Sequence, residues 1–199
     1  AGLTLNGANT FSGGTTLNAG VLTVGNNDAL GSGALSLGGN ASLDAGVAVN
    51  LGNAVNLAGN TLSVLGTSAT TLGGVISGTG ALVKNGAAGL TLNGANPFSG
   101  GTTLNAGVLT VGNNNALGTG ALSLGGNASL DAGVAVNLGN AIDLGANTLS
   151  VLGSNATPLG GVISGTGALI KNGTANLTLG GTNTFSGGLN LNARTLTLA

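Results

Sequence analysis

Residues 73–112 read GGVISGTGALVKNGAAGLTLNGANPFSGGTTLNAGVLTVG, and this stretch decides the fold. In ALVK at 81–84 and LTL at 90–92, apolar side chains fall on every second residue, which is the spacing of a β-strand with one buried face. Gly and Asn separate these short runs, and both residues tolerate the positive φ of a sharp corner. No helical stripe survives, because each Gly costs about 1 kcal/mol in a helix interior. The stretch therefore predicts short strands joined by tight corners.

The same pattern extends toward the N-terminus. Alternating runs are LTL at 3–5, VLTV at 21–24, ALSL at 34–37, VAVNL at 47–51 and TLSV at 61–64. Pairs such as Asn6-Gly7 and Gly38-Gly39 separate them. We predict that the apolar residues of these runs face the interior, namely Leu5, Leu17, Leu22, Val24, Leu35, Leu37 and their counterparts 87 residues on.

The chain is an internal repeat. Phe11, Phe98 and Phe185 are separated by 87 residues, and residues 2–88 and 89–175 are two copies that differ at 12 of 87 positions. Residues 176–199 begin a third copy. The exchange of Val55 for Ile142 keeps β-branching and approximate volume, as a packed site requires.

The composition excludes several classes of protein. Gly contributes 42 residues and charged residues only 4%, and there is no Glu, His, Cys, Met, Trp or Tyr. Low charge and a hydrophobic fraction of 42% argue against disorder. A net charge of −1 offers no basic patch for nucleic acid. No run approaches the roughly 18 consecutive apolar residues of a spanning helix, so we expect no membrane insertion of this segment.

These features together predict an all-β fold, a single parallel β-solenoid over residues 1–199. About ten strands per copy, three to a coil, give three to four coils per copy and roughly eight or nine in the chain. At ~4.8 Å per coil these make a rod of about 40 Å. Asn residues of successive coils are expected to form hydrogen-bonded ladders.

The stretch 73–112 resembles the autotransporter-associated β-strand repeat. The family pattern is Ile-x-Gly-x-Gly-x-Leu-x-Lys-x-Gly, then Leu-Thr-Leu-x-Gly-x-Asn-Thr-aromatic-Ser-Gly-Gly-Thr, then Ala-Gly-x-Leu. The matching residues are Ile76, Gly78, Gly80, Leu82, Lys84, Gly86, Leu90, Thr91, Leu92, Gly94, Asn96, Phe98, Ser99, Gly100, Gly101, Thr102, Ala106, Gly107 and Leu109. Pro97 departs from the usual Thr, and in the third copy Leu189, Asn190 and Arg194 replace Thr, Thr and Gly.

The resemblance covers about 40 of every 87 residues. It implies a right-handed parallel β-helix, a passenger segment of a type V secreted protein at, or released from, the cell surface of a Gram-negative bacterium. The matching positions are scaffold positions, so the resemblance implies no catalytic residue.

The charged residues are the first candidates for chemistry. They are Asp28, Asp44, Lys84, Asp131, Asp143, Lys171 and Arg194. Asp44 and Asp131 are candidate calcium ligands or, as we predict, turn carboxylates bonded to backbone N–H groups, because calcium requires six to eight oxygens. Lys84 and Lys171 are candidates for binding an anionic glycan or, as we predict, solvated residues that prevent unwanted strand pairing.

Catalysis lacks its usual groups. No His is present to activate a Ser or Thr, and the four Asp are sparse and vary between copies, since Asp28 becomes Asn115 and Asn56 becomes Asp143. We therefore predict no catalytic, cofactor-binding or metal-ligating residues, no cofactor, and no enzyme.

Three functions remain open. The first is a structural stalk, the second is an adhesin or biofilm-matrix module whose coils continue between molecules, and the third is a glycan-active enzyme or lectin. Neither end carries an amphipathic or charged cap, so we expect end-to-end stacking on neighbouring repeats or on other copies of the chain. Other cells or surfaces are further possible partners.

Overall fold

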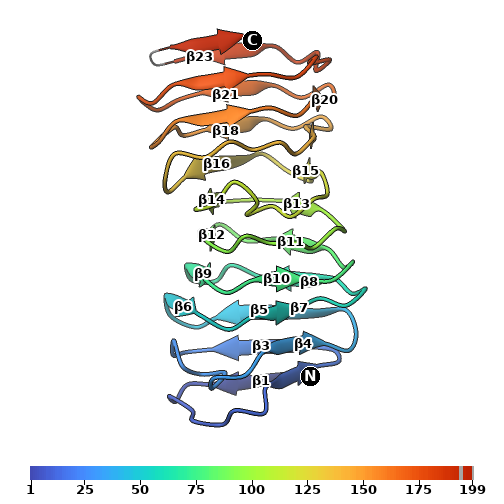
Figure 1. Ribbon diagram of the computed structural model, residues 1–199, viewed down its shortest axis with the longest axis vertical. Coiled ribbons are helices and arrows are strands. Elements are labelled where there is room, and N and C mark those ends of the chain that lie inside the picture. The colour runs from blue at the N-terminus through green and yellow to red at the C-terminus, as the bar shows by residue number, and fades with distance from the viewer. Residues whose placement is uncertain (193–194, 199) are drawn as a thin grey trace.

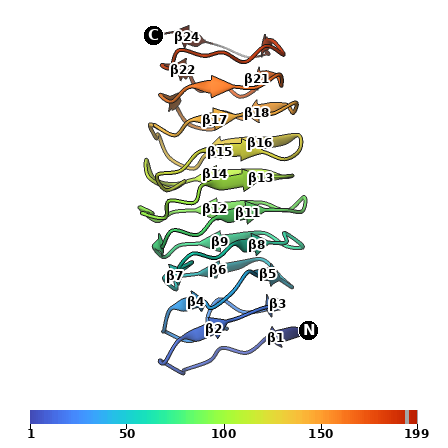
Figure 2. The same cartoon turned by 90° about the vertical axis from the view of Figure 1, so that its right-hand side faces the viewer.

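The computed structural model describes residues 1–192 and 195–198, and Arg194 lies outside them. Within the described residues all regular structure is β-strand, and the chain winds upward from the N-terminus as a stack of coils (Figures 1 and 2). This confirms the predicted β-solenoid.

Three faces enclose the coil, and all strand pairs are parallel and join strands of neighbouring coils. Face A is a nine-stranded sheet of β1 (Gly2–Leu5), β3 (Val21–Val24), β5 (Ala41–Ala45), β8 (Leu62–Val64), β11 (Leu82–Lys84), β13 (Thr102–Leu104), β15 (Leu122–Leu124), β17 (Ile142–Asp143) and β20 (Ile163–Ser164). Face B is an eight-stranded sheet of β6 (Val49–Leu51), β9 (Thr70–Leu72), β12 (Leu90–Leu92), β14 (Val108–Val111), β16 (Ala128–Ala132), β18 (Leu149–Val151), β21 (Leu169–Lys171) and β23 (Leu189–Leu191).

Face C holds two smaller sheets. The first has β2 (Thr15–Leu17), β4 (Leu35–Leu37), β7 (Val55–Asn56) and β10 (Ile76–Ser77). The second has β19 (Thr157–Leu159), β22 (Leu177–Leu179) and β24 (Leu196–Leu198). Strands β7, β10 and β19 each come along the chain between a strand of face B and the next strand of face A.

One coil takes about 20 residues. On face A, Leu62 pairs with Leu82 and Leu82 with Thr102, and neighbouring pairs along faces A and B are 19 to 21 residues apart. The chain therefore makes about ten turns, more than the eight or nine predicted. Each copy holds about ten strands, as predicted, but some coils have only two strands, because segments such as residues 94–98 complete the coil without forming a strand.

The 87-residue repeat is not a whole number of coils. It spans four coils and about one third of another, so equivalent strands lie on different faces. Residues 21–24 lie on face A, whereas their counterparts 108–111 lie on face B. Residues 70–72 lie on face B, and their counterparts 157–159 lie on face C. Each copy is thus turned by one face about the axis of the solenoid.

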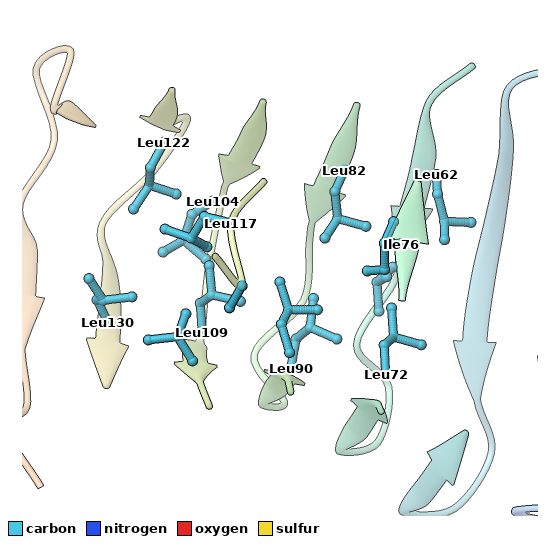
Figure 3. Close-up of a cluster of buried hydrophobic side chains, with 14 of the residues drawn as sticks. Leu62, Leu72, Ile76, Leu82, Leu90, Leu104, Leu109, Leu117, Leu122 and Leu130 are labelled. Atoms are coloured by element: carbon cyan, nitrogen blue, oxygen red, sulfur yellow. The ribbon is translucent and has the colours of Figure 1, made fainter. Parts of the chain in front are cut away.

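The core is one continuous column of aliphatic side chains. Leu residues of successive strands point into the same interior space from opposite walls (Figure 3). Of the twelve residues predicted to face the interior, ten are buried. Leu5 and Leu17 are half-buried but pack against the same cluster, because the first coil has a neighbour on one side only. The inside–outside prediction is confirmed.

The predicted Asn ladders form as pairs. Asn105 Nδ2 donates to Asn85 Oδ1 (2.6 Å), and Asn192 Nδ2 donates to Asn172 Oδ1 (2.8 Å). Each pair links two successive coils.

Candidate functional site

The carboxylates of Asp44 and Asp131 fasten one coil to the next. Asp44 accepts a backbone hydrogen bond from Thr67 (3.1 Å) and another from the Thr67 hydroxyl (2.7 Å). Asp131 accepts the same two bonds from Ser154 (3.0 and 2.7 Å). The predicted bond to a backbone N–H group is confirmed, and its donor lies 23 residues further along the chain. The predicted place in a turn is wrong, because Asp44 lies in β5 and Asp131 in β16.

The acidic side chains are not gathered into one site. Asp44 lies on face A and Asp131 on face B, and Asp143 accepts a bond from the nearby Gly145 N–H (2.9 Å). Among residues 1–192 and 195–198 there is no group of three or more His, Cys, Asp or Glu that could hold a metal ion. These carboxylates act as links within the scaffold.

The prediction that Lys84 and Lys171 are solvated is wrong. Both side chains are fully buried, at 0% exposure. The Lys84 amine donates to the carbonyl oxygens of Asn85, Gly86 (2.7 Å) and Ala106 (3.2 Å). The Lys171 amine donates to Asn172 (3.4 Å) and Gly173 (2.6 Å). Each amine thus donates hydrogen bonds to backbone carbonyl groups at a corner of the coil.

The alternation of inward and outward residues in the sequence already indicated that the Lys side chains face the interior. In ALVK at 81–84, Lys84 follows Leu82 by two residues and so shares its inward face. Burial lowers the pKa of the Lys84 amine below the ordinary 10.5. Burial also lowers the pKa of Lys171, and the negative charge of Asp131 opposes that shift.

The buried side-chain amide of Asn96 links neighbouring coils at a place on face C where no strand forms. Residues 94–98 form no strand on face C, yet Asn96 Oδ1 accepts the Ile76 N–H (2.8 Å) and Asn96 Nδ2 donates to Ala116 O (2.6 Å). Asn96 therefore bridges the coil below and the coil above. Its counterpart Asn183 accepts the Ile163 N–H (2.8 Å) in the same way. Sequence reasoning identified Asn96 as a motif position without this role.

Two polar grooves on the surface are equivalent under the 87-residue shift. The first amide groove is lined by the side chains of Asn27, Asp28, Ser32, Asn50 and Asn53. The second amide groove is lined by those of Asn114, Asn115, Thr119, Asn137 and Asn140. Their volumes are about 210 and 220 Å³. Sequence reasoning missed both, because the residues of each groove come from two successive coils.

Wider, shallower depressions lie over the strands themselves. One runs across β3, β5 and β8, where Val21, Ser42 and Ser63 are in register, and its counterpart crosses β14, β16 and β18. Small side chains account for both hollows, and the hydroxyl groups of Ser42 and Ser63 line the first of them.

No helix among the described residues is long and apolar enough to cross a membrane.

Three segments of the chain are similar to a known family of repeats. The model of a family described as the Passenger-associated-transport-repeat matches residues 2–24, 82–111 and 169–198. The matched segments total 83 of the 199 residues, and each is similar to one such repeat. No curated protein and no solved structure matched the chain.

These repeats confirm the resemblance found in the sequence. The first match runs from β1 to β3, the second from β11 to β14 and the third from β21 to β24. The second contains the inward-facing Lys84, the bridging Asn96 and the buried Phe98. The matches and the β-solenoid fold together support a structural segment of autotransporter-passenger type, and the matching family implies a secreted or surface location.

Proposed function

We propose that this segment is a rigid stalk that holds other parts of a passenger away from the surface of a Gram-negative cell. The observation that carries the proposal is the nine-stranded sheet of face A, whose strands run from residue 2 to residue 164 in unbroken parallel pairing over one continuous core. Such a stack resists bending because each inner coil is hydrogen-bonded to both of its neighbours. The carboxylates and amines serve the scaffold, which supports a structural role over an enzymatic one.

The length of the stalk should follow the number of repeats. Each added copy contributes four and a third coils, which at ~4.8 Å per coil lengthens the rod by about 21 Å. Small-angle X-ray scattering on chains extended by one, two and three copies of residues 89–175 tests this. A maximum dimension that grows by this constant step, with an unchanged cross-section, is expected. A dimension that levels off would contradict a rigid stalk.

End-to-end association is a second candidate. The junction between copies supports it, because β11 of the first copy pairs with β13 of the second, and the equivalent β21 pairs with β23 in the same register. Near-identical copies therefore offer the same interface within a chain and between chains, and an interface that does not close gives a filament. Analytical ultracentrifugation should show oligomers that grow with concentration, and a monomer at all concentrations would exclude this candidate.

A further inference from the structure

The walls of the two amide grooves are held in place by hydrogen bonds. In the first groove, Asn27 Oδ1 accepts the Asn50 N–H (2.8 Å), and Asn53 Nδ2 donates to Gly31 O (2.9 Å) and Gly33 O (2.7 Å). The second groove repeats this arrangement with Asn114, Asn137 and Asn140, at 2.8 to 2.9 Å. Both grooves are therefore formed before any ligand arrives.

Other polar groups in the grooves are left without partners. The side chains of Asp28 and Asn50 are exposed and make no hydrogen bond to any residue in the described part of the chain. The same holds for the side chains of their counterparts Asn115 and Asn137, within residues 1–192 and 195–198. Each groove thus presents amide donors and oxygen acceptors from two coils to the same small space.

The differences between the copies define the chemistry of the ligand. Two of the 12 exchanged positions line the grooves, where Asp28 becomes Asn115 and Ser32 becomes Thr119. Both exchanges keep hydrogen-bonding oxygens, but the first removes the only charge. A cation or an ionic ligand would require that charge, and an apolar ligand would require apolar walls, which both grooves lack.

We propose that the amide grooves bind a neutral glycan, one sugar unit in each groove. Amide and hydroxyl groups carried on walls that are already held in place suit a ligand that is uncharged and carries many hydroxyl groups. The volumes of about 210 and 220 Å³ leave room for a single sugar ring.

Because each copy is rotated by a third of a turn, the two amide grooves lie at different faces of the solenoid. The first groove borders β6 on face B, whereas the second borders Leu138, which bridges to β19 on face C. Successive sites are about 21 Å apart along the axis and point in different directions. We therefore expect weak binding to a single oligosaccharide and stronger binding to a polymer that reaches several sites.

The test uses a printed panel of neutral and acidic oligosaccharides, followed by an NMR titration of the chain with the best neutral binder. The double variant N50A/N137A removes one side-chain amide from each groove and breaks no side-chain hydrogen bond among residues 1–192 and 195–198. N176A changes an exposed Asn outside both grooves and is the matched control. D28N tests whether charge is needed, because it makes the first groove resemble the second.

We expect at least one neutral glycan to shift the amide signals of both grooves. N50A/N137A should weaken that binding at least tenfold, whereas N176A should leave it within twofold, with thermal unfolding unchanged for all variants. Four results would overturn the proposal: no binding of any neutral glycan, binding of acidic glycans only, neutral binding that N50A/N137A leaves intact, or loss of neutral binding in D28N.

Discussion

The buried amines of Lys84 and Lys171 show how a polar side chain enters an aliphatic core. An isolated ammonium group in such a core is costly, and backbone carbonyl oxygens reduce that cost. Lys84 reaches Gly86 in its own coil and Ala106 in the next. The side chain therefore joins two coils at a corner where the carbonyls would otherwise lack donors.

The lowered pKa values of these amines predict how the free energy of unfolding depends on pH. Burial lowers the pKa of both amines from 10.5, so between the lowered pKa and 10.5 the unfolded chain binds more protons than the folded chain. The free energy of unfolding should therefore rise with pH through this window. Urea titrations at a series of alkaline pH values measure the slope.

The K84M/K171M double variant is the control for that experiment, because Met fills a similar volume without an ionisable group. Its unfolding free energy should be flat over the same window, and each single variant should lose part of the slope. An equal slope in the double variant would assign the effect to other groups.

Thr102 carries an unpaired hydroxyl in the core. Its Oγ1 is the one buried side-chain oxygen or nitrogen without a hydrogen-bond partner in the described part of the chain. Thr102 lies between Leu82 and Leu122 on neighbouring strands, and its counterpart in the third copy is Leu189. T102V should therefore raise the free energy of unfolding by about 1 kcal/mol.

Thermal and urea unfolding measure this gain. The outward-facing T103V is the control and should change stability by less than about 0.5 kcal/mol. A loss of stability in T102V would mean that the hydroxyl has a partner in solution.

Substitution of Asn96 should lower the free energy of unfolding, in contrast to T102V. N96A leaves the Ile76 N–H and the Ala116 carbonyl without partners inside the solenoid, and it should cost about 2–4 kcal/mol. N93A removes an exposed amide three residues earlier and should be nearly neutral. Equal unfolding free energies for the two variants would show that the bridge across the coils contributes nothing.

At the scale of the element, no strand is stable by itself. Most strands are three residues long, and their side chains alternate between buried and half-buried positions. A strand of this length gains stability only by pairing with the coils above and below it. The stability of each coil therefore depends on its contacts with the neighbouring coils. A defect in one coil should therefore act locally.

L22D places a charge at a core position of β3, where Leu22 is 1% exposed and pairs with Leu43 of β5. We expect the coils around β3 to unfold, because a buried carboxylate without a partner costs several kcal/mol. Hydrogen exchange should show lost protection in β1 to β5 and retained protection beyond β11. T16D, on the exposed side of β2, should retain protection throughout, and protection of β3 in L22D would contradict the inside–outside assignment.

At the scale of the molecule, the offset between repeat and coil controls the surface. Because 87 residues make four coils and a third, any feature of the repeat moves to a new face in each copy. Equivalent positions return to the same face only after three copies. Rods of this kind present no single face that carries the same residues in every copy.

Spin labels test this geometry, since the native chain has no Cys. Cysteines at Val21 and Thr103 lie in one column of face A, four strand spacings or about 19 Å apart. Cysteines at Thr23 and Thr110 occupy equivalent repeat positions on faces A and B. Electron–electron resonance should give a clearly longer distance for the second pair, and equal distances would mean that the copies are in phase.

The sequence by itself determined the solenoid, the strands and the inward-facing residues, because alternation within a strand and Gly or Asn at a corner act over a few residues. The burial of Lys84 was also readable from its place two residues after Leu82, but its partner Ala106 lies in the next coil. Only the tertiary structure decided the length of a coil, and with it the third-of-a-turn offset, the coil-to-coil bonds of Asp44 and Asn96, and the amide grooves. The reason is physical: the length of a coil is the sum of three strands and three corners that must close on the coil below, and no local pattern reports that sum.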